Sequence, residues 1–147
     1  MNITPQEIAE TLAMVSEQNL DLRTITMGIS LNSCADEDLD RMCQKVYDRI
    51  TCQAEHLVAV AEDLEREYGI PIANKRVSVT PIAQIAACTS AQDLTPLAHT
   101  LDHAAETLGI DFLGGFSALV HKGLGDADRR LIASIPEALA TTSRVCS

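Results

Sequence analysis

The stretch from Arg23 to Asn32, RTITMGISLN, alternates between apolar and small polar side chains. Its apolar positions are Ile25, Met27, Ile29 and Leu31, and the positions between them are Thr24, Thr26, Gly28, Ser30 and Asn32. A period of two is typical of a β-strand that buries one face and leaves the other wet. The stretch therefore predicts a strand whose apolar face packs under helices, and it leaves open what the polar face does.

A helix is expected before this strand. Thr4 and Glu7 have the spacing of a capping box, and Pro5 suits the first helical position. We expect this helix to end near Asn19. Its predicted buried stripe consists of Ile8, Leu12 and Val15.

A longer helix is expected after the strand. Apolar residues recur in steps of three and four from Leu39 to Tyr68, and Gly69 and Pro71 then stop the pattern. The sequence therefore predicts one continuous helix over about 36–68, which would be roughly 45–50 Å long. Such a length suggests a larger body or a partner chain against which the helix lies.

The rest of the chain repeats the strand-and-helix rhythm. Strands are expected over about 76–80 and 111–116, helices over about 82–88, 94–108 and 126–142, and the first steps of a fourth strand at 144–147. Strands separated by helices predict an α/β fold with a parallel sheet and right-handed crossovers. Three strands and a fragment cannot close a barrel, so we expect residues 1–147 to be a single incomplete domain, the N-terminal fragment of a longer barrel.

Polar side chains recur on the later strands as well. The second strand carries Arg76, Ser78 and Thr80 on one side, and Asp111, Gly115 and Ser117 are the positions expected on the same face of the third. This face could line the wet lumen of a wide barrel, or it could simply face solvent.

Charge and cysteine content exclude several classes of function. The net charge of −10 argues against nucleic acid and against anionic membrane surfaces as partners. There is no run of about 20 apolar residues and no signal-peptide pattern at the N-terminus. The five cysteines show no CxxC spacing, which is typical of a reducing cytoplasm.

The candidate ligand-binding residues lie on or just after the strands. Asn32, Thr80 and Ser117 follow three strands, and the adjacent glycines Gly114 and Gly115 would let main chain approach a ligand closely. Arg76 offers a planar fork for a carboxylate or phosphate. An internal ion pair, for example with Asp111, is the alternative reading of Arg76.

One short motif is similar to a metal-binding pattern. His99, Asp102 and His103 are spaced as in HxxEH, with aspartate in place of glutamate. No third ligand is evident, so we predict neither a metal nor any other cofactor.

Four blocks of the sequence resemble one known family. They are LDLRTITMGISL, EREYGIPIANKRVSVTPI, IDFLGGFSALVHKG and SIPEALATTSRVCS. They are similar to the N-terminal third of the "PFL family protein" group, a bacterial and archaeal family of unknown function. The resemblance implies a fold like that of pyruvate formate-lyase, a large α/β barrel of about ten strands made from two half-barrels, and a homodimer.

Three functions are compatible with these observations. The first is a binding protein or enzyme that holds a small anionic metabolite in a polar barrel lumen. The second is a regulatory or scaffold homodimer that acts through its surface and the long helix. The third is glycyl-radical catalysis, which we rank last because residues 1–147 contain neither a radical glycine loop nor adjacent cysteines.

Overall fold

The fold is built on a parallel sheet whose four strands follow the order β1-β2-β3-β4. In this computed structural model, which describes residues 4–17, 22–121 and 123–147, the strands are β1 (Ile25–Ile29), β2 (Lys75–Val79), β3 (Phe112–Gly114) and β4 (Val145–Cys146). Every neighbouring pair is parallel. The predicted parallel α/β fold is thus confirmed, and in the described part of the chain the sheet is open, with β1 and β4 at its edges.

The helices connect the strands much as the sequence predicts. They are α1 (Pro5–Ser16), the 3₁₀ turn η1 (Asn32–Cys34), α2 (Leu39–Ala54), α3 (Leu57–Tyr68), α4 (Ile82–Ala86), α5 (Thr95–Leu108) and α6 (Asp126–Thr141). The capping box of Thr4 and Glu7 is present. Gly69 and Gly109 end α3 and α5 in the left-handed conformation, where glycine carries no Cβ penalty.

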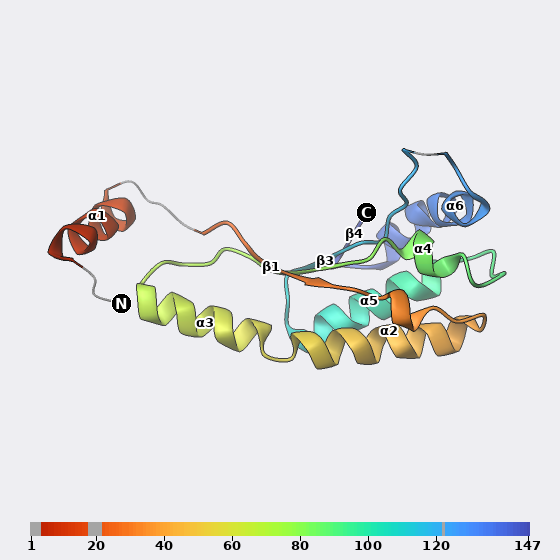
Figure 1. Ribbon diagram of the computed structural model, residues 1–147, viewed down its shortest axis with the longest axis horizontal. Helices are drawn as coiled ribbons and strands as arrows, with labels where there is room; N and C mark the ends of the chain where they lie inside the picture. The colour runs from red at the N-terminus through yellow and green to blue at the C-terminus, as the bar shows by residue number, and fades with distance from the viewer. Residues whose placement is uncertain (1–3, 18–21, 122) are drawn as a thin grey trace.

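The core lies between the apolar face of the sheet and helices α2 and α5. These two helices run side by side along one face of the sheet (Figure 1) and contact each other extensively. Met42 and Ile50 of α2 are fully buried, as are Leu97 and Leu101 of α5. Burial of such side chains stabilises the fold by about 1.5–3 kcal/mol each.

The two faces of β1 are those that the alternation predicts. Ile29 and Leu31 are buried, whereas Thr26, Gly28 and Asn32 are exposed. The apolar pattern therefore identifies correctly which side of the strand packs under the helices.

The face prediction for the third strand is wrong by one residue. The register pairs Arg76 with Phe112 and Ser78 with Gly114, so Phe112 and Gly114 lie on the polar face and Leu113 points into the core. A strand this short, with two glycines at its end, has little alternation of its own. Its faces are set by pairing with β2, because a shift of one residue exchanges the two sides.

The predicted continuous helix over 36–68 is also wrong, because a turn at Glu55 and His56 separates α2 from α3. The buried residues of α2 recur in strict steps of four from Met42 to Ala54. At 3.6 residues per turn, each such step rotates the stripe by about 40° around the helix. The turn resets the direction of the apolar stripe, so that α3 contacts β2 while α2 contacts β1 and α5.

The predicted buried stripe of α1 is exposed where the structure describes it. Ile8 and Leu12 are 50% and 62% exposed, and α1 lies apart from the sheet and the other helices (Figure 1). An amphipathic pattern specifies a stripe but not the surface that covers it. The side chain of Val15 and the predicted helix end near Asn19 fall outside the described residues.

A small polar network fastens α3 to the start of β2. The carboxylate of Glu65 accepts a hydrogen bond from the main-chain N–H of Ile72 at 2.7 Å and from the ammonium of Lys75 at 3.1 Å. The Ile72 N–H, followed by Lys75, lowers the pKa of the Glu65 carboxyl below its ordinary value. Both partners favour the charged carboxylate, so ionisation of Glu65 is coupled to folding.

We expect Glu65→Gln to be less stable than the native protein at pH 7 and equally stable in acid. Because the pKa is depressed in the folded state, this contribution is present above the unfolded pKa, about 4.3, and is lost as pH falls through the lower folded pKa. Denaturation at several pH values measures the difference. The exposed neighbour Glu67→Gln is the control, and a Glu65→Gln difference that stays constant down to pH 3 would contradict the linkage.

Candidate functional site

The carboxyl ends of the first three strands are joined by one hydrogen bond from main chain to a side chain and by two between main-chain groups. The hydroxyl of Thr80 accepts a hydrogen bond from the N–H of Leu31 at 3.1 Å. The N–H groups of Ile82 and Ala83 donate to the carbonyls of Gly115 and Ser117 at 2.9 and 3.3 Å. The structure thus brings the predicted residues Asn32, Thr80, Gly115 and Ser117 together at the carboxyl ends of the strands. There Thr80 and the two carbonyls hold the loops together.

Gly115 makes the closest of these approaches. Its φ is +130°, and a Cβ added there would lie 2.5 Å from Cγ2 and 2.8 Å from the carbonyl oxygen of Val79. This conformation and this space accept only glycine. In the described structure Gly115 therefore allows the chain after β3 to lie directly against the end of β2, where there is no room for a side chain.

Arg76 lies on the polar face near the amino end of β2. Its neighbours across the sheet are Thr26 on β1 and Phe112 on β3. The guanidinium carbon lies 5.1 Å from the centre of the Phe112 ring, a cation–π distance. The Nε atom of Arg76 is buried and has no hydrogen-bond partner among the described residues.

The alternative reading of Arg76, an ion pair with Asp111, is wrong. The carboxylate of Asp111 instead accepts the main-chain N–H of Lys75 at 2.7 Å. Within the residues that the structure describes, Arg76 pairs with no carboxylate. The guanidinium lies over the Phe112 ring, and no carboxylate of the described residues neutralises its charge.

Five of the six predicted residues occupy two places: Arg76 lies near the amino end of β2, and the other four lie at the carboxyl ends of the strands. Thr80 lies four residues beyond Arg76 on the same chain segment, about 13 Å along an extended strand. Gly114 lies between the two places, paired with Ser78 on the polar face. The four-residue spacing already implies this separation, but an alternating pattern shows only the face of a strand and not the position along it where a ligand binds.

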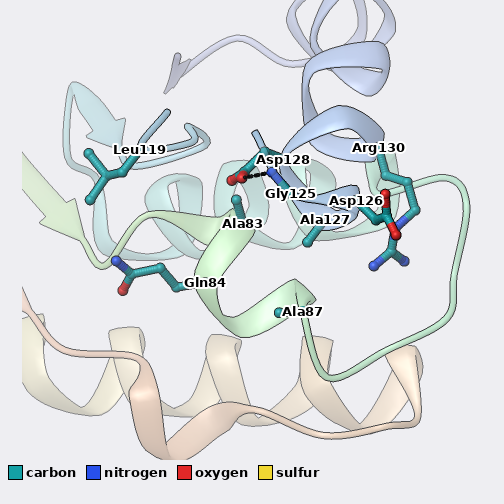
Figure 2. Close-up of a pocket in the computed structure, with 9 residues that line it drawn as sticks. All are labelled: Ala83, Gln84, Ala87, Leu119, Gly125, Asp126, Ala127, Asp128 and Arg130. Carbon is teal, nitrogen blue, oxygen red and sulfur yellow. Dashed lines mark hydrogen bonds between the residues drawn. The ribbon is translucent and has the colours of Figure 1, made fainter. Parts of the chain in front are cut away.

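A separate cavity of about 580 Å³ opens between α4 and the start of α6 (Figure 2). Its charged lining consists of Asp126, Asp128 and Arg130. Asp128 accepts the N–H of Gly125 at 2.8 Å, closing the first turn of α6. The Arg130 guanidinium donates to the carbonyls of Ala86, Thr89 and Ala91. Asp128 and Arg130 thus already serve the fold, and nothing in the sequence singles out this cavity.

The motif of His99, Asp102 and His103, which is similar to a metal-binding pattern, makes contacts within the fold. Asp102 accepts the N–H groups of Ser143 and Arg144 at 3.0 and 2.7 Å, which positions the entry to β4. His99 bonds to the hydroxyl of Thr141 at 2.8 Å, and His103 stacks on Tyr47. The three side chains have different partners. No group of three or more potential metal ligands occurs in the described ranges.

These features define a parallel α/β protein with a polar sheet face and an arginine there that no acid neutralises in the described residues. The chain belongs to the family described as "Uncharacterised ACR (DUF711)", which matches residues 13–147.

Curated relatives called "UPF0210 protein" are closely similar. The chain is 60% identical over 141 residues to that of Desulforamulus reducens, covering 96% of this chain and 31% of the relative. It is 59% identical over 145 residues to that of Pelotomaculum thermopropionicum, covering 99% and 32%. A Lactobacillus delbrueckii subsp. bulgaricus relative is 61% identical over 142 residues, covering 97% and 32%. The chain thus spans about a third of the length of these relatives.

The hydropathy of the helices bears on membrane insertion. None of the helices in the described segments combines the length and the apolar character needed to cross a bilayer.

Proposed function

We propose that this protein binds a small anionic metabolite on the polar face of its sheet, with Arg76 as the principal contact. The observation that carries the proposal is a half-buried arginine without an acidic partner in the described residues, in a chain of net charge −10. A buried donor left without a partner costs about 1–3 kcal/mol, and more when the group is charged. A carboxylate ligand would offset that cost.

The surroundings of Arg76 suit anion recognition. The ring of Phe112 supports one face of the guanidinium, which limits the orientations of the fork. The hydroxyl-bearing residues Thr26 and Ser78 lie beside it on the same face and supply neutral polar contacts. A guanidinium held in one orientation can bind a carboxylate through two parallel hydrogen bonds.

We further propose that the polar face lines the lumen of a large α/β barrel of the pyruvate-formate-lyase type in a longer cytoplasmic protein, with residues 1–147 as its N-terminal third. Support comes from the parallel strand order and from relatives about three times as long. The cytoplasm is supported by five unpaired cysteines. In this arrangement a ligand at Arg76 would be shielded from bulk water, which strengthens its ionic contact.

A second candidate, a regulatory or scaffold homodimer, is favoured by exposed apolar side chains. Ile8 and Met14 on α1 and Val60 and Tyr68 on α3 are exposed. Large exposed apolar side chains that gather on helices are typical of contact surfaces. Sedimentation of the full-length protein tests this candidate: a monomer at every concentration would exclude it.

We expect Arg76→Gln to weaken carboxylate binding about 10-fold to 100-fold, since a hydrogen-bonded pair with a charged group contributes about 1.5–3 kcal/mol. Thermal shift and calorimetry of the full-length protein with acetate, benzoate and inorganic phosphate measure the effect. Arg49→Gln is the control because Arg49 is an exposed residue of α2 with the same charge. Equal losses of affinity in both variants would show that the net charge of the protein causes the effect. An unchanged affinity in Arg76→Gln would refute the proposal.

A further inference from the structure

We infer that one side of α6, formed by Ile132, Ile135 and Leu139, is the docking surface for an amphipathic helix that follows residue 147 in the full-length protein. We call this surface the α6 flank. The inference rests on the longer protein proposed above, but not on the binding of an anion. It gives a partner to a surface to which the proposed function assigns no role.

The apolar surface of α6 continues beyond the side that the core covers. Leu131 and Ala138 are buried, and Ile135 is partly buried and packs against the core. Ile132 and Leu139 are 45% and 42% exposed. At about 100° per residue, these two side chains project within about 20° of each other, and Ile135 lies between them and the buried pair. The flank is therefore continuous with the core and differs from scattered apolar residues on a surface.

The flank lies on the side of α6 that is turned away from α5. Ser134 accepts the main-chain N–H of Leu94, at the start of α5, at 3.1 Å. Thr141 bonds to His99 of α5 at 2.8 Å. Ser134 and Thr141 thus mark the side that faces α5, and the flank lies roughly 160° around the helix from them.

The side of α6 that faces solvent has a different composition. Arg129, Ala133 and Ala140 are exposed there, and none of these side chains is large and apolar. An amphipathic helix with one neighbouring surface has one apolar stripe. In α6 the apolar arc extends from the buried residues to the flank, which is typical of a helix with neighbours on both sides.

The path of the chain indicates which element covers the flank. The strands are parallel and follow one another in chain order. A right-handed crossover after each strand places its helix beside the preceding one, as α5 contacts α2 and α6 contacts α5. The described residues place β3 on one side of β4 and no strand on the other. Relatives are about three times as long, and another parallel strand beside β4 requires a crossover, usually a helix, next to α6.

The size of the flank favours a segment of the same chain over a second copy. Ile132 and Leu139 are about 10 Å apart along the helix, which matches two turns of a packed helix. Two half-exposed side chains are a small part of the roughly 800 Å² that each partner of a standard interface buries. Docking within one chain does not lose the translational freedom that association of two molecules costs.

Photo-cross-linking of the full-length protein identifies what covers the flank. We expect Leu139→benzoylphenylalanine to cross-link to peptides beyond residue 147 of the same chain, with at least tenfold higher yield than Ala140→benzoylphenylalanine. Ala140 is the control because it is the adjacent position on the solvent side. Mixing with an isotope-labelled copy distinguishes cross-links within one chain from those between two copies.

Thiol labelling tests the same surface with a smaller change. We expect Ile132→Cys to react with N-ethylmaleimide at least tenfold more slowly than Ala133→Cys, as followed by mass spectrometry of the labelled peptides. Cysteine is a small apolar side chain, so this comparison decides the question if the bulky group at position 139 prevents folding.

Three results would overturn the inference: equal labelling at positions 132 and 133, cross-links only to residues 1–147, or cross-links to the second copy. Binding of carboxylates to Arg76 is measured separately. A covered flank in a protein that binds no carboxylate would uphold the inference and refute the proposed function. An open flank in a protein that binds a carboxylate through Arg76 would do the reverse.

Discussion

Replacing Gly115 with alanine is expected to lower the free energy of unfolding by about 3 kcal/mol or more. Two effects add at this position. The φ of +130° is strained for any residue with a Cβ, and that Cβ would lie 2.5 Å from Cγ2 and 2.8 Å from the carbonyl oxygen of Val79. The side-chain atom could rotate away, but the carbonyl belongs to β2 and cannot move without disturbing the junction with β3.

Urea or guanidinium denaturation of the full-length protein measures this loss, and Gly114→Ala is the control. Gly114 neighbours Gly115 but lacks a positive φ, and a Cβ there would meet nothing within 4 Å. We expect Gly114→Ala to change the unfolding free energy by less than about 1 kcal/mol. Equal effects at the two positions would show that the close contact at Val79 does not determine the requirement for glycine.

Arg130→Ala is expected to lower the free energy of unfolding by about 3 kcal/mol. The guanidinium donates to the carbonyl of Ala86, the last residue of α4, and to those of Thr89 and Ala91 in the connection between α4 and α5. A hydrogen bond from a charged donor contributes about 1.5–3 kcal/mol, and bonds that share one donor group are not additive. The loss should also release this connection from α6.

Arg129→Ala is the matched control for Arg130→Ala. It removes the same charge from the adjacent position of α6, where the side chain is exposed. Arg130→Lys should recover part of the loss, because an ammonium can still donate but cannot reach three carbonyls as a planar fork does. Hydrogen exchange of residues 87–94 reports the connection directly, and protection unchanged in Arg130→Ala would contradict the role assigned to the guanidinium.

The candidate site was predictable in its parts but not in its arrangement. Arg76 was recognisable as a residue that suits an anion, and the adjacent Gly114 and Gly115 as residues that allow a close approach to main chain. Only the pairing of strands shows that Phe112 supports Arg76. The sequence also could not distinguish Gly114 from Gly115, since their difference lies in the distance to Val79.

The sequence by itself determined the strands, most of the helices and their order. Caps, helix-stopping glycines and apolar periods act within one or two turns of chain, so the parallel α/β pattern and the buried face of β1 could be predicted from them. The tertiary structure alone decided the face of β3, the turn between α2 and α3, and the partners of Arg76 and Asp102. These features depend on contacts between residues that are distant in sequence, and the register of the sheet and the packing of helices set those contacts.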